Sequence, residues 1–212
     1  MKYPAILFDL DGTLTDSGEG VINCVLLALR HYGIEISNRD SLRYFVGPPL
    51  RESFLKAGVP AESVEEAIAI YRSRYIPIGM FENYPYEGIR ELLAQLKERG
   101  HQLYVATSKP ETMAIAILEK FELAQYFDII CGATMDDSRD SKDKVIGYLL
   151  SRIGPQTAVM IGDTAYDVIG AAAHNIPTIG VSWGYGKVED LANAGAADIV
   201  HTPEELLSAL AL

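Results

Sequence analysis

The sequence has 212 residues, of which 49% are hydrophobic and 22% are charged, so it is expected to be globular, with room for one large domain or a core and a smaller one. The net charge of -11 and the absence of a Lys/Arg stripe exclude nucleic acid as an expected partner. No apolar run approaches the roughly 18 residues of a membrane span, so we expect neither a membrane-spanning segment nor a membrane partner. Cys24 and Cys131 are isolated, which favours reduced thiols and a cytoplasmic location.

The first predicted element is a strand over residues 5–8, where four apolar residues run directly into two carboxylates. Such a short apolar run is typical of a strand that is buried on both faces of a parallel sheet. Strand alternation would place Asp9 and Asp11 on the same side, and Gly12 would allow a sharp turn after them. Two carboxylates at the end of a buried strand are costly unless a cation or a proton neutralises them.

A helical insert is predicted after this strand. Apolar residues recur at helical spacing, and Gly and Pro residues separate the segments, which gives helices over 17–32, 38–45, 50–57 and 61–75. No strand is indicated between about residues 15 and 83. We therefore expect a small all-helical cap domain over residues 15–85, inserted into a core made of residues 1–14 and 86–212.

The remaining chain alternates between helix and strand. Strands are predicted over 103–106, 127–131, 158–161, 177–181 and 198–200. Helices are predicted from 89 to the stop at Gly100, and over 110–120, 143–153, 166–174, 188–194 and 203–210. Repeated units of this kind predict an α/β fold: a doubly wound, Rossmann-like parallel sheet with helices on both faces.

Polar residues follow three of the predicted strands. They are Asp9 and Asp11 after the first, Thr107 and Ser108 after the second, and the string Gly162-Asp163 with Asp167 a helical turn later after the third. The carboxyl ends of parallel strands share one edge of a sheet, so these groups can converge. Four facing carboxylates would repel one another, and oxygen-only ligands favour Mg²⁺. On its own, Asp163 would more simply be read as a helix N-cap.

Together the strings Asp9-x-Asp11-Gly12-Thr13 and Gly162-Asp163-x-x-x-Asp167 resemble the haloacid-dehalogenase-like hydrolase superfamily over nearly the whole chain. In the predicted cap, Val46-Gly47-Pro48-Pro49-Leu50 is similar to the cap loop of phosphoglycolate-phosphatase-like members.

The resemblance implies a role for each acidic residue of the motifs. Asp9 would be the nucleophile that forms an aspartyl phosphate, and Asp11 would act first as general acid and then as base. Thr107 would bind the phosphoryl oxygens. Mg²⁺ would be held by the Asp9 carboxylate, the main-chain carbonyl of Asp11 and Asp163. Asp167 would act through a water or support these ligands from behind.

The family also has a lysine before the helix that precedes the Gly-Asp strand. We assign Lys142 to this role because its spacing resembles a 5'-nucleotidase-like branch, and Lys144 is the alternative. The Lys-Pro pair of many phosphoglycolate phosphatases is missing here. Further substrate contacts are expected from core residues Gly12 and Ser108, and from residues Arg43, Gly47 and Arg51 in or beside the cap loop, although solvated helix charges are the commoner role of such arginines.

The function implied is Mg²⁺-dependent hydrolysis of a small phosphorylated metabolite, either phosphoglycolate or a nucleoside 5'-monophosphate, by a monomer or homodimer. Asp11 argues against a dehalogenase, which would not need an acid at this position. A sugar phosphomutase of the same superfamily remains an alternative, as does a non-catalytic phosphate-binding or receiver-like protein.

Overall fold

The computed structural model forms two compact units, Met1–Thr15 with Pro85–Leu212, and Asp16–Tyr84. These boundaries lie one residue from those expected from the sequence. No helix in the described part of the chain is both long and apolar enough to cross a membrane. The structure describes residues 2–136, 138–154 and 156–210.

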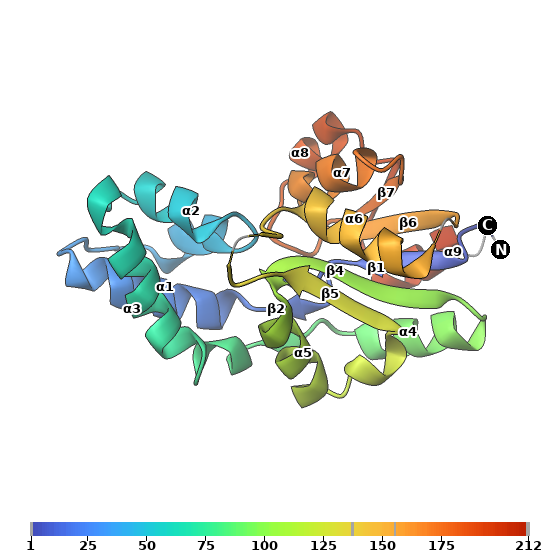
Figure 1. The fold of residues 1–212 in the computed structure, drawn as a ribbon, viewed down its shortest axis with the longest axis horizontal. Helices are drawn as coiled ribbons and strands as arrows, with labels where there is room; N and C mark the ends of the chain where they lie inside the picture. The colour runs from blue at the N-terminus through green and yellow to red at the C-terminus, as the bar shows by residue number, and fades with distance from the viewer. Residues whose placement is uncertain (1, 137, 155, 211–212) are drawn as a thin grey trace. The chain divides into compact units, whose positions relative to one another are not determined.

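The larger unit is built on a six-stranded sheet in which every paired strand is parallel to its neighbour (Figure 1). The strand order is β5-β4-β1-β6-β7-β8. This arrangement confirms the predicted α/β fold. The strands are β1 (Ala5–Phe8), β4 (Gln102–Pro110), β5 (Ile129–Ala133), β6 (Ala158–Gly162), β7 (Thr178–Val181) and β8 (Asp198–Val200).

Strand β1 lies between β4 and β6, the two other strands that carry polar motifs. Its four side chains are completely buried, as expected for a strand covered on both faces. Phe8 is in register with Val105 of β4 and Ile161 of β6. The carboxyl ends of the three strands therefore lie at the same edge, which brings the residues after them together.

Helices cover both faces of this sheet (Figure 1). Helices α6, α7 and α8 lie on one face, while α4, α5 and α9 lie on the other. Alternation along β1 sends Leu7 into the core beneath α6 and α7, which also contains Met160 and Val145. The helices are α4 (Ile89–Glu98), α5 (Glu111–Lys120), α6 (Lys142–Ile153), α7 (Ala165–Ala172), α8 (Val188–Ala194) and α9 (Pro203–Leu210).

Strand β4 differs from the prediction because it runs on to Pro110 rather than ending near residue 106. Ala106 pairs with Cys131 of β5, but the next paired residue of β4 is Pro110, which is opposite Ala133. Four steps along β4 thus match two steps along β5. This irregularity is a bulge, a feature that turns side chains in new directions beside functional sites.

The smaller unit contains α1 (Gly18–His31), α2 (Leu50–Lys56) and α3 (Val64–Tyr75), with short 3₁₀ helices between them. The expected helix after Asn38 is a 3₁₀ helix, Arg39–Phe45, and the Asn38 side chain caps it by accepting from the main-chain N–H of Asp40. Aromatic contacts join Phe45 to Phe54 and Phe54 to Tyr71. The sequence did not indicate the two-residue strands β2 (Thr15–Asp16) and β3 (Tyr84–Pro85), because such short strands show no alternation.

Candidate active site

Three buried aspartates lie together at the carboxyl edge of the sheet. Asp9 follows β1, Asp163 follows β6, and Asp167 is in the first turn of α7. One carboxylate oxygen of each lies within 4.8 Å of the others. The cluster thus joins the two acidic strings, residues 9–13 and 162–167, which are far apart in the sequence.

The side chain of Lys142 lies inside this cluster. Its Nζ is 2.8 Å from Asp9 Oδ1 and 2.7 Å from Asp167 Oδ1, and it donates a hydrogen bond to the main-chain oxygen of Ala106 at 3.0 Å. Burial would lower the pKa of Lys142, but the two carboxylates outweigh it and raise the pKa above its usual value. Lys144, the alternative lysine, instead pairs with Asp140 on the surface at 2.8 Å.

Asp163 is completely buried and accepts hydrogen bonds from two other segments of the chain. Its Oδ1 accepts from Thr13 Oγ1 at 3.2 Å, and its Oδ2 accepts from the main-chain N–H of Tyr185 at 2.8 Å. Burial, followed by the charges of Asp167 and Asp9, raises the pKa of Asp163 to about 8. The carboxyl group is therefore costly to ionise unless a positive charge joins it.

The pKa of Asp9 is also raised. Burial is the largest cause, and the charge of Asp167 adds to it, while Lys142 and the hydroxyl of Thr107 act in the opposite direction. Thr107 itself is buried at the start of the β4 bulge. A second positive group near Asp9 would lower its pKa and favour the ionised, nucleophilic form.

Asp167 is fixed by the start of its own helix. Its Oδ2 accepts from the main-chain N–H and the hydroxyl of Thr164, at 3.0 and 2.9 Å, which forms a capping box. Its other oxygen contacts Lys142. The capping box therefore fixes the carboxylate that contacts Lys142, while the predicted role of Asp167 toward a metal ion stays a prediction.

Three glycines leave room for these carboxylates. Gly12 has a φ of +85°, and a Cβ there would lie 2.2 Å from Asp163 Oδ2. A Cβ at Gly162 would lie 2.3 Å from Asp167 Cγ. Gly184, in the loop after β7, is equally close to Asp163, and the neighbouring Trp183 donates its Nε1 hydrogen to the main-chain oxygen of Thr13.

Asp11 has a partner that the motifs did not predict. Its Oδ2 lies 2.6 Å from Nζ of Lys109, and both side chains are largely buried. Lys109 follows Thr107 and Ser108 in the β4 bulge. Its position two residues after the expected Thr was the only sequence signal, and it could not show which way the side chain turns.

The predicted cap residues belong to the smaller unit. Arg43 is in the 3₁₀ helix Arg39–Phe45, and Gly47 follows it with a φ of +102°. Arg51, on α2, lies 3.4 Å from Glu65 in an exposed pair. The contacts of these residues with substrate stay predictions, as does that of Ser108, which is half-buried in β4.

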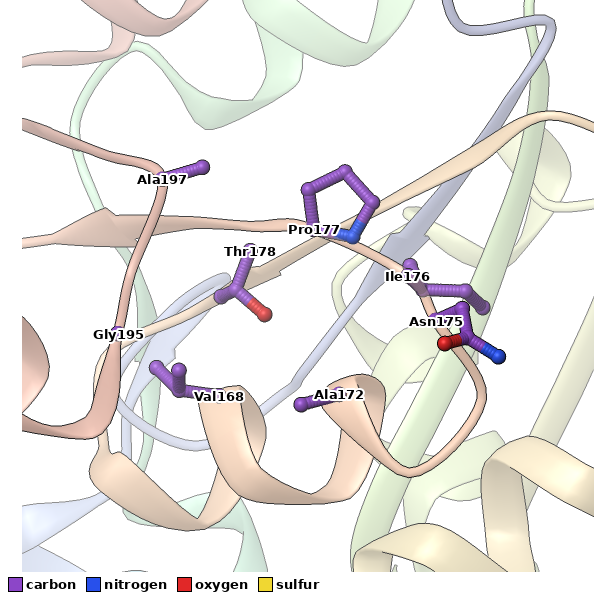
Figure 2. A pocket seen from close by; sticks show the side chains of 8 residues that line it. All are labelled: Val168, Ala172, Asn175, Ile176, Pro177, Thr178, Gly195 and Ala197. Carbon is purple, nitrogen blue, oxygen red and sulfur yellow. The ribbon is translucent and has the colours of Figure 1, made fainter.

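A separate hollow of about 310 Å³ lies at the other end of the strands (Figure 2). It is bounded by the end of α7, the start of β7 and the segment before β8, and its lining includes Val168, Thr178 and Ala197. Ligands of open α/β sheets bind at the carboxyl ends of the strands. Because the acidic cluster lies at the carboxyl ends and this hollow at the opposite ends, the hollow is distinct from the acidic site.

The donor set of the acidic cluster fits a magnesium ion. Asp9, Asp163 and Asp167 offer only oxygen atoms, which Mg²⁺ prefers. When the three are ionised, Lys142 balances one negative charge and leaves two. A buried excess of this size is stable only with a cation or bound protons.

Comparison with known proteins gives the family. Residues 6–181 match the family model described as haloacid dehalogenase-like hydrolase. The chain belongs to this family. Its structure is similar to the crystal structure of a predicted phosphatase from Clostridium acetobutylicum, with a TM-score of 0.94, 45% identity, and coverage of 100% of this chain and 99% of that one.

Curated relatives of this haloacid dehalogenase-like hydrolase have differing names. A 5'-nucleotidase of Pseudomonas aeruginosa is 41% identical over 90% of this chain and 88% of its own length. The tyrosine-protein kinase PtkA of Mycobacterium tuberculosis is 42% identical over 97% of this chain and 72% of its own length. The family and its phosphatase-named members confirm the predicted enzyme class, a hydrolase that acts as a phosphatase.

Proposed function

We propose that this enzyme is a Mg²⁺-dependent phosphatase that hydrolyses a small phosphomonoester through a phosphate ester of Asp9. The observation that carries the proposal is the buried cluster of Asp9, Asp163 and Asp167 around Lys142. A nucleophilic carboxylate, an acid two residues away and a set of positive groups are the requirements of two-step phosphoryl transfer. The site combines these groups on rigid strand ends.

In the first step, a carboxylate oxygen of Asp9 attacks the phosphorus atom of the substrate. The new bond joins phosphorus to this oxygen, and the bond from phosphorus to the alcohol oxygen breaks. Asp11 gives its proton to that oxygen, so the product leaves as a neutral alcohol. Lys142 and the Thr107 hydroxyl stabilise the negative charge that develops on the phosphoryl oxygens.

In the second step, water attacks the phosphorus atom of the Asp9 phosphate. Asp11, now a carboxylate, accepts a proton from this water, and the bond between phosphorus and the Asp9 oxygen breaks. Inorganic phosphate leaves, and both aspartates return to their starting states. Atoms and protons balance over the two steps, since one water and one monoester give one alcohol and one phosphate.

The proposed ligands of Mg²⁺ are the carboxylates of Asp9 and Asp163 and the main-chain carbonyl of Asp11, with Asp167 behind them. When bound, the ion would supply positive charge to the phosphoryl oxygens. It would also give the site the local attraction that a protein of net charge -11 otherwise lacks for an anionic substrate.

The proposed substrates are phosphoglycolate and nucleoside 5'-monophosphates. The nucleotide is supported by the 41% identity to a 5'-nucleotidase, and phosphoglycolate by the loop of residues 46–50, which is similar to that of phosphoglycolate-phosphatase-like proteins. The kinase-named relative supports a second candidate, transfer of the Asp9 phosphoryl group to a protein hydroxyl instead of water.

The test is phosphate release from phosphoglycolate, nucleoside 5'-monophosphates and sugar phosphates, with Mg²⁺ or with a chelator. We expect release that needs Mg²⁺ and is absent in Asp9→Asn protein. Release that survives the chelator or the Asn variant would contradict the proposal. Loss of substrate without free phosphate would favour the mutase, and phosphate passed from the enzyme to a tyrosine peptide would favour the kinase-like candidate.

A further inference from the structure

The ion pair between Lys109 and Asp11 is outside the acidic cluster, and the steps described above do not use the lysine. Asp11 Oδ2 lies 2.6 Å from Lys109 Nζ, and the side chains are 14% and 6% exposed. The other oxygen of Asp11, Oδ1, is buried and has no hydrogen-bond partner in the part of the chain that the structure describes. The two oxygens of this carboxyl group are therefore in different environments.

The backbone holds Lys109 in place from two sides. Its main-chain N–H donates to the hydroxyl of Thr107 at 3.2 Å, across the bulge of β4. On β5, a Cβ at Gly132 would lie only 2.5 Å from the main-chain oxygen of Lys109, so this close approach requires glycine. The lysine thus starts from a fixed point, and a buried, short ion pair of this kind has little freedom to rearrange.

We propose that Lys109 is a positioning residue for Asp11. Oδ2 accepts the hydrogen bond from Lys109 whether or not Asp11 is protonated, which leaves Oδ1 as the oxygen that carries the proton, gives it to the leaving group and then takes one from the attacking water. This inference rests on the proposed function, in which Asp11 is the acid and base. An acid that is held in one orientation needs no reorganisation when the bond to the leaving group breaks.

This role differs from direct binding of the phosphoryl group, which Lys142 and Thr107 are proposed to perform. A phosphate-binding lysine would affect all monoesters to a similar degree. A lysine that acts through Asp11 would matter most where the leaving group needs a proton. Alkyl phosphates have such leaving groups, whereas 2,4-dinitrophenolate departs without one.

The test compares Lys109→Met with the wild type on an alkyl phosphate and on 2,4-dinitrophenyl phosphate. The quantity measured is the single-turnover rate of leaving-group release. We expect a loss of about 10- to 100-fold on the alkyl phosphate, as for a misplaced catalytic group, with little change in KM. The loss on the dinitrophenyl ester should be much smaller, and Lys109→Arg should recover part of the alkyl rate.

A double variant gives a second, independent readout. If Lys109 acts through Asp11, the variant Asp11→Asn with Lys109→Met should be no slower than Asp11→Asn alone. Lys97→Met is the matched control, because Lys97 pairs with Asp128 at 3.0 Å on the surface and its loss should leave every rate unchanged. Melting temperatures of all variants report whether they fold.

Three results would overturn the inference while the proposed function stands. They are an unchanged rate in Lys109→Met, an equal loss on both substrates with a raised KM, and additive losses in the double variant. If Lys109→Met does not fold, Lys109→Arg is compared with the wild type instead. A loss of rate on the alkyl phosphate alone would then support the inference, and rates equal to those of the wild type on both esters would oppose it. A wild type that hydrolyses neither ester would instead overturn the proposed function, and the inference with it.

Discussion

Lys142 sets the balance of charge among the site residues. Its ammonium group touches two of the three clustered carboxylates, and its side chain is 4% exposed. Removing it would leave buried carboxylates without their partner, which is more costly than removing a surface charge. Lys144 is only two residues away, but its 2.8 Å contact is with the exposed Asp140.

The two lysines can be separated by matched substitutions. We expect Lys142→Met to lower kcat by about 10²- to 10³-fold, because a fixed positive group that faces developing charge is lost. Lys144→Met should stay near the wild-type rate, since exposed ion pairs contribute little. Steady-state kinetics with excess Mg²⁺ would measure both. The opposite ranking would assign the role to Lys144.

At the scale of single residues, the sequence could predict those site residues that are recognisable from the residues next to them in the chain. Asp9 and Asp163 each follow an apolar strand and precede a glycine or a helix, which places them without knowledge of the fold. Lys109 had no such signal, because its pairing with Asp11 spans 98 positions and depends on a bulge. Alternation along an ideal strand cannot predict a bulge.

Among the elements, the loop between β7 and α8 has more influence on the site than its sequence indicated. It donates the Tyr185 N–H to Asp163, and a Cβ at Gly184 would lie 2.3 Å from Asp163 Oδ2 and 2.4 Å from the main-chain oxygen of Gly12. Its Gly-rich composition is typical of many turns. Only the packing shows that these glycines are required for close approach to a carboxylate.

Substitution of Gly184 by Ala should therefore act on metal binding. We expect the Mg²⁺ concentration for half-maximal activity to rise by about 10-fold or more, since groups that orient metal ligands have effects of this size. A magnesium titration of activity measures it. Gly195→Ala is the control for backbone strain alone, because Gly195 has a φ of +94° but no atom lies within 4 Å of an added Cβ, so it should leave the magnesium requirement unchanged. An unchanged magnesium requirement in Gly184→Ala would oppose this assignment.

At the scale of the whole molecule, the fold could be predicted well because its signals are local and repeated. Buried strands, amphipathic helices and glycine stops alternate along residues 86–212, and such alternation favours a parallel sheet. The order of the strands was not predicted. The pairing of β1 with both β4 and β6 depends on contacts across about 100 residues or more, which no local pattern shows.

The raised pKa values predict how stability depends on pH in chelated protein. The pKa of Asp163 is raised to about 8 from 3.8, chiefly by burial, so the folded state binds more protons than the unfolded state between these values. The contribution of Asp163 to the free energy of unfolding is therefore present at low pH and is lost as the pH rises toward 8. We expect the melting temperature with a chelator to fall from pH 5 to pH 8.

The variant Asp163→Asn is the control for this effect, because its amide does not titrate. It should lose most of the fall in melting temperature, and added Mg²⁺ should stabilise the wild type more at pH 8 than at pH 5. Differential scanning calorimetry would measure both. A wild-type curve that is flat over this range, or a variant that falls as steeply, would contradict the charge balance described here.

The central claim is that Asp9 carries the phosphoryl group, and chemical trapping tests it most directly. Asp11→Asn protein with Mg²⁺ and 2,4-dinitrophenyl phosphate should accumulate the intermediate, because the leaving group needs no proton while the water step lacks its base. Acid quench, borohydride reduction and peptide mass spectrometry should then find homoserine at position 9. Phosphate release with no modified residue, or with the modification at another position, would contradict the account.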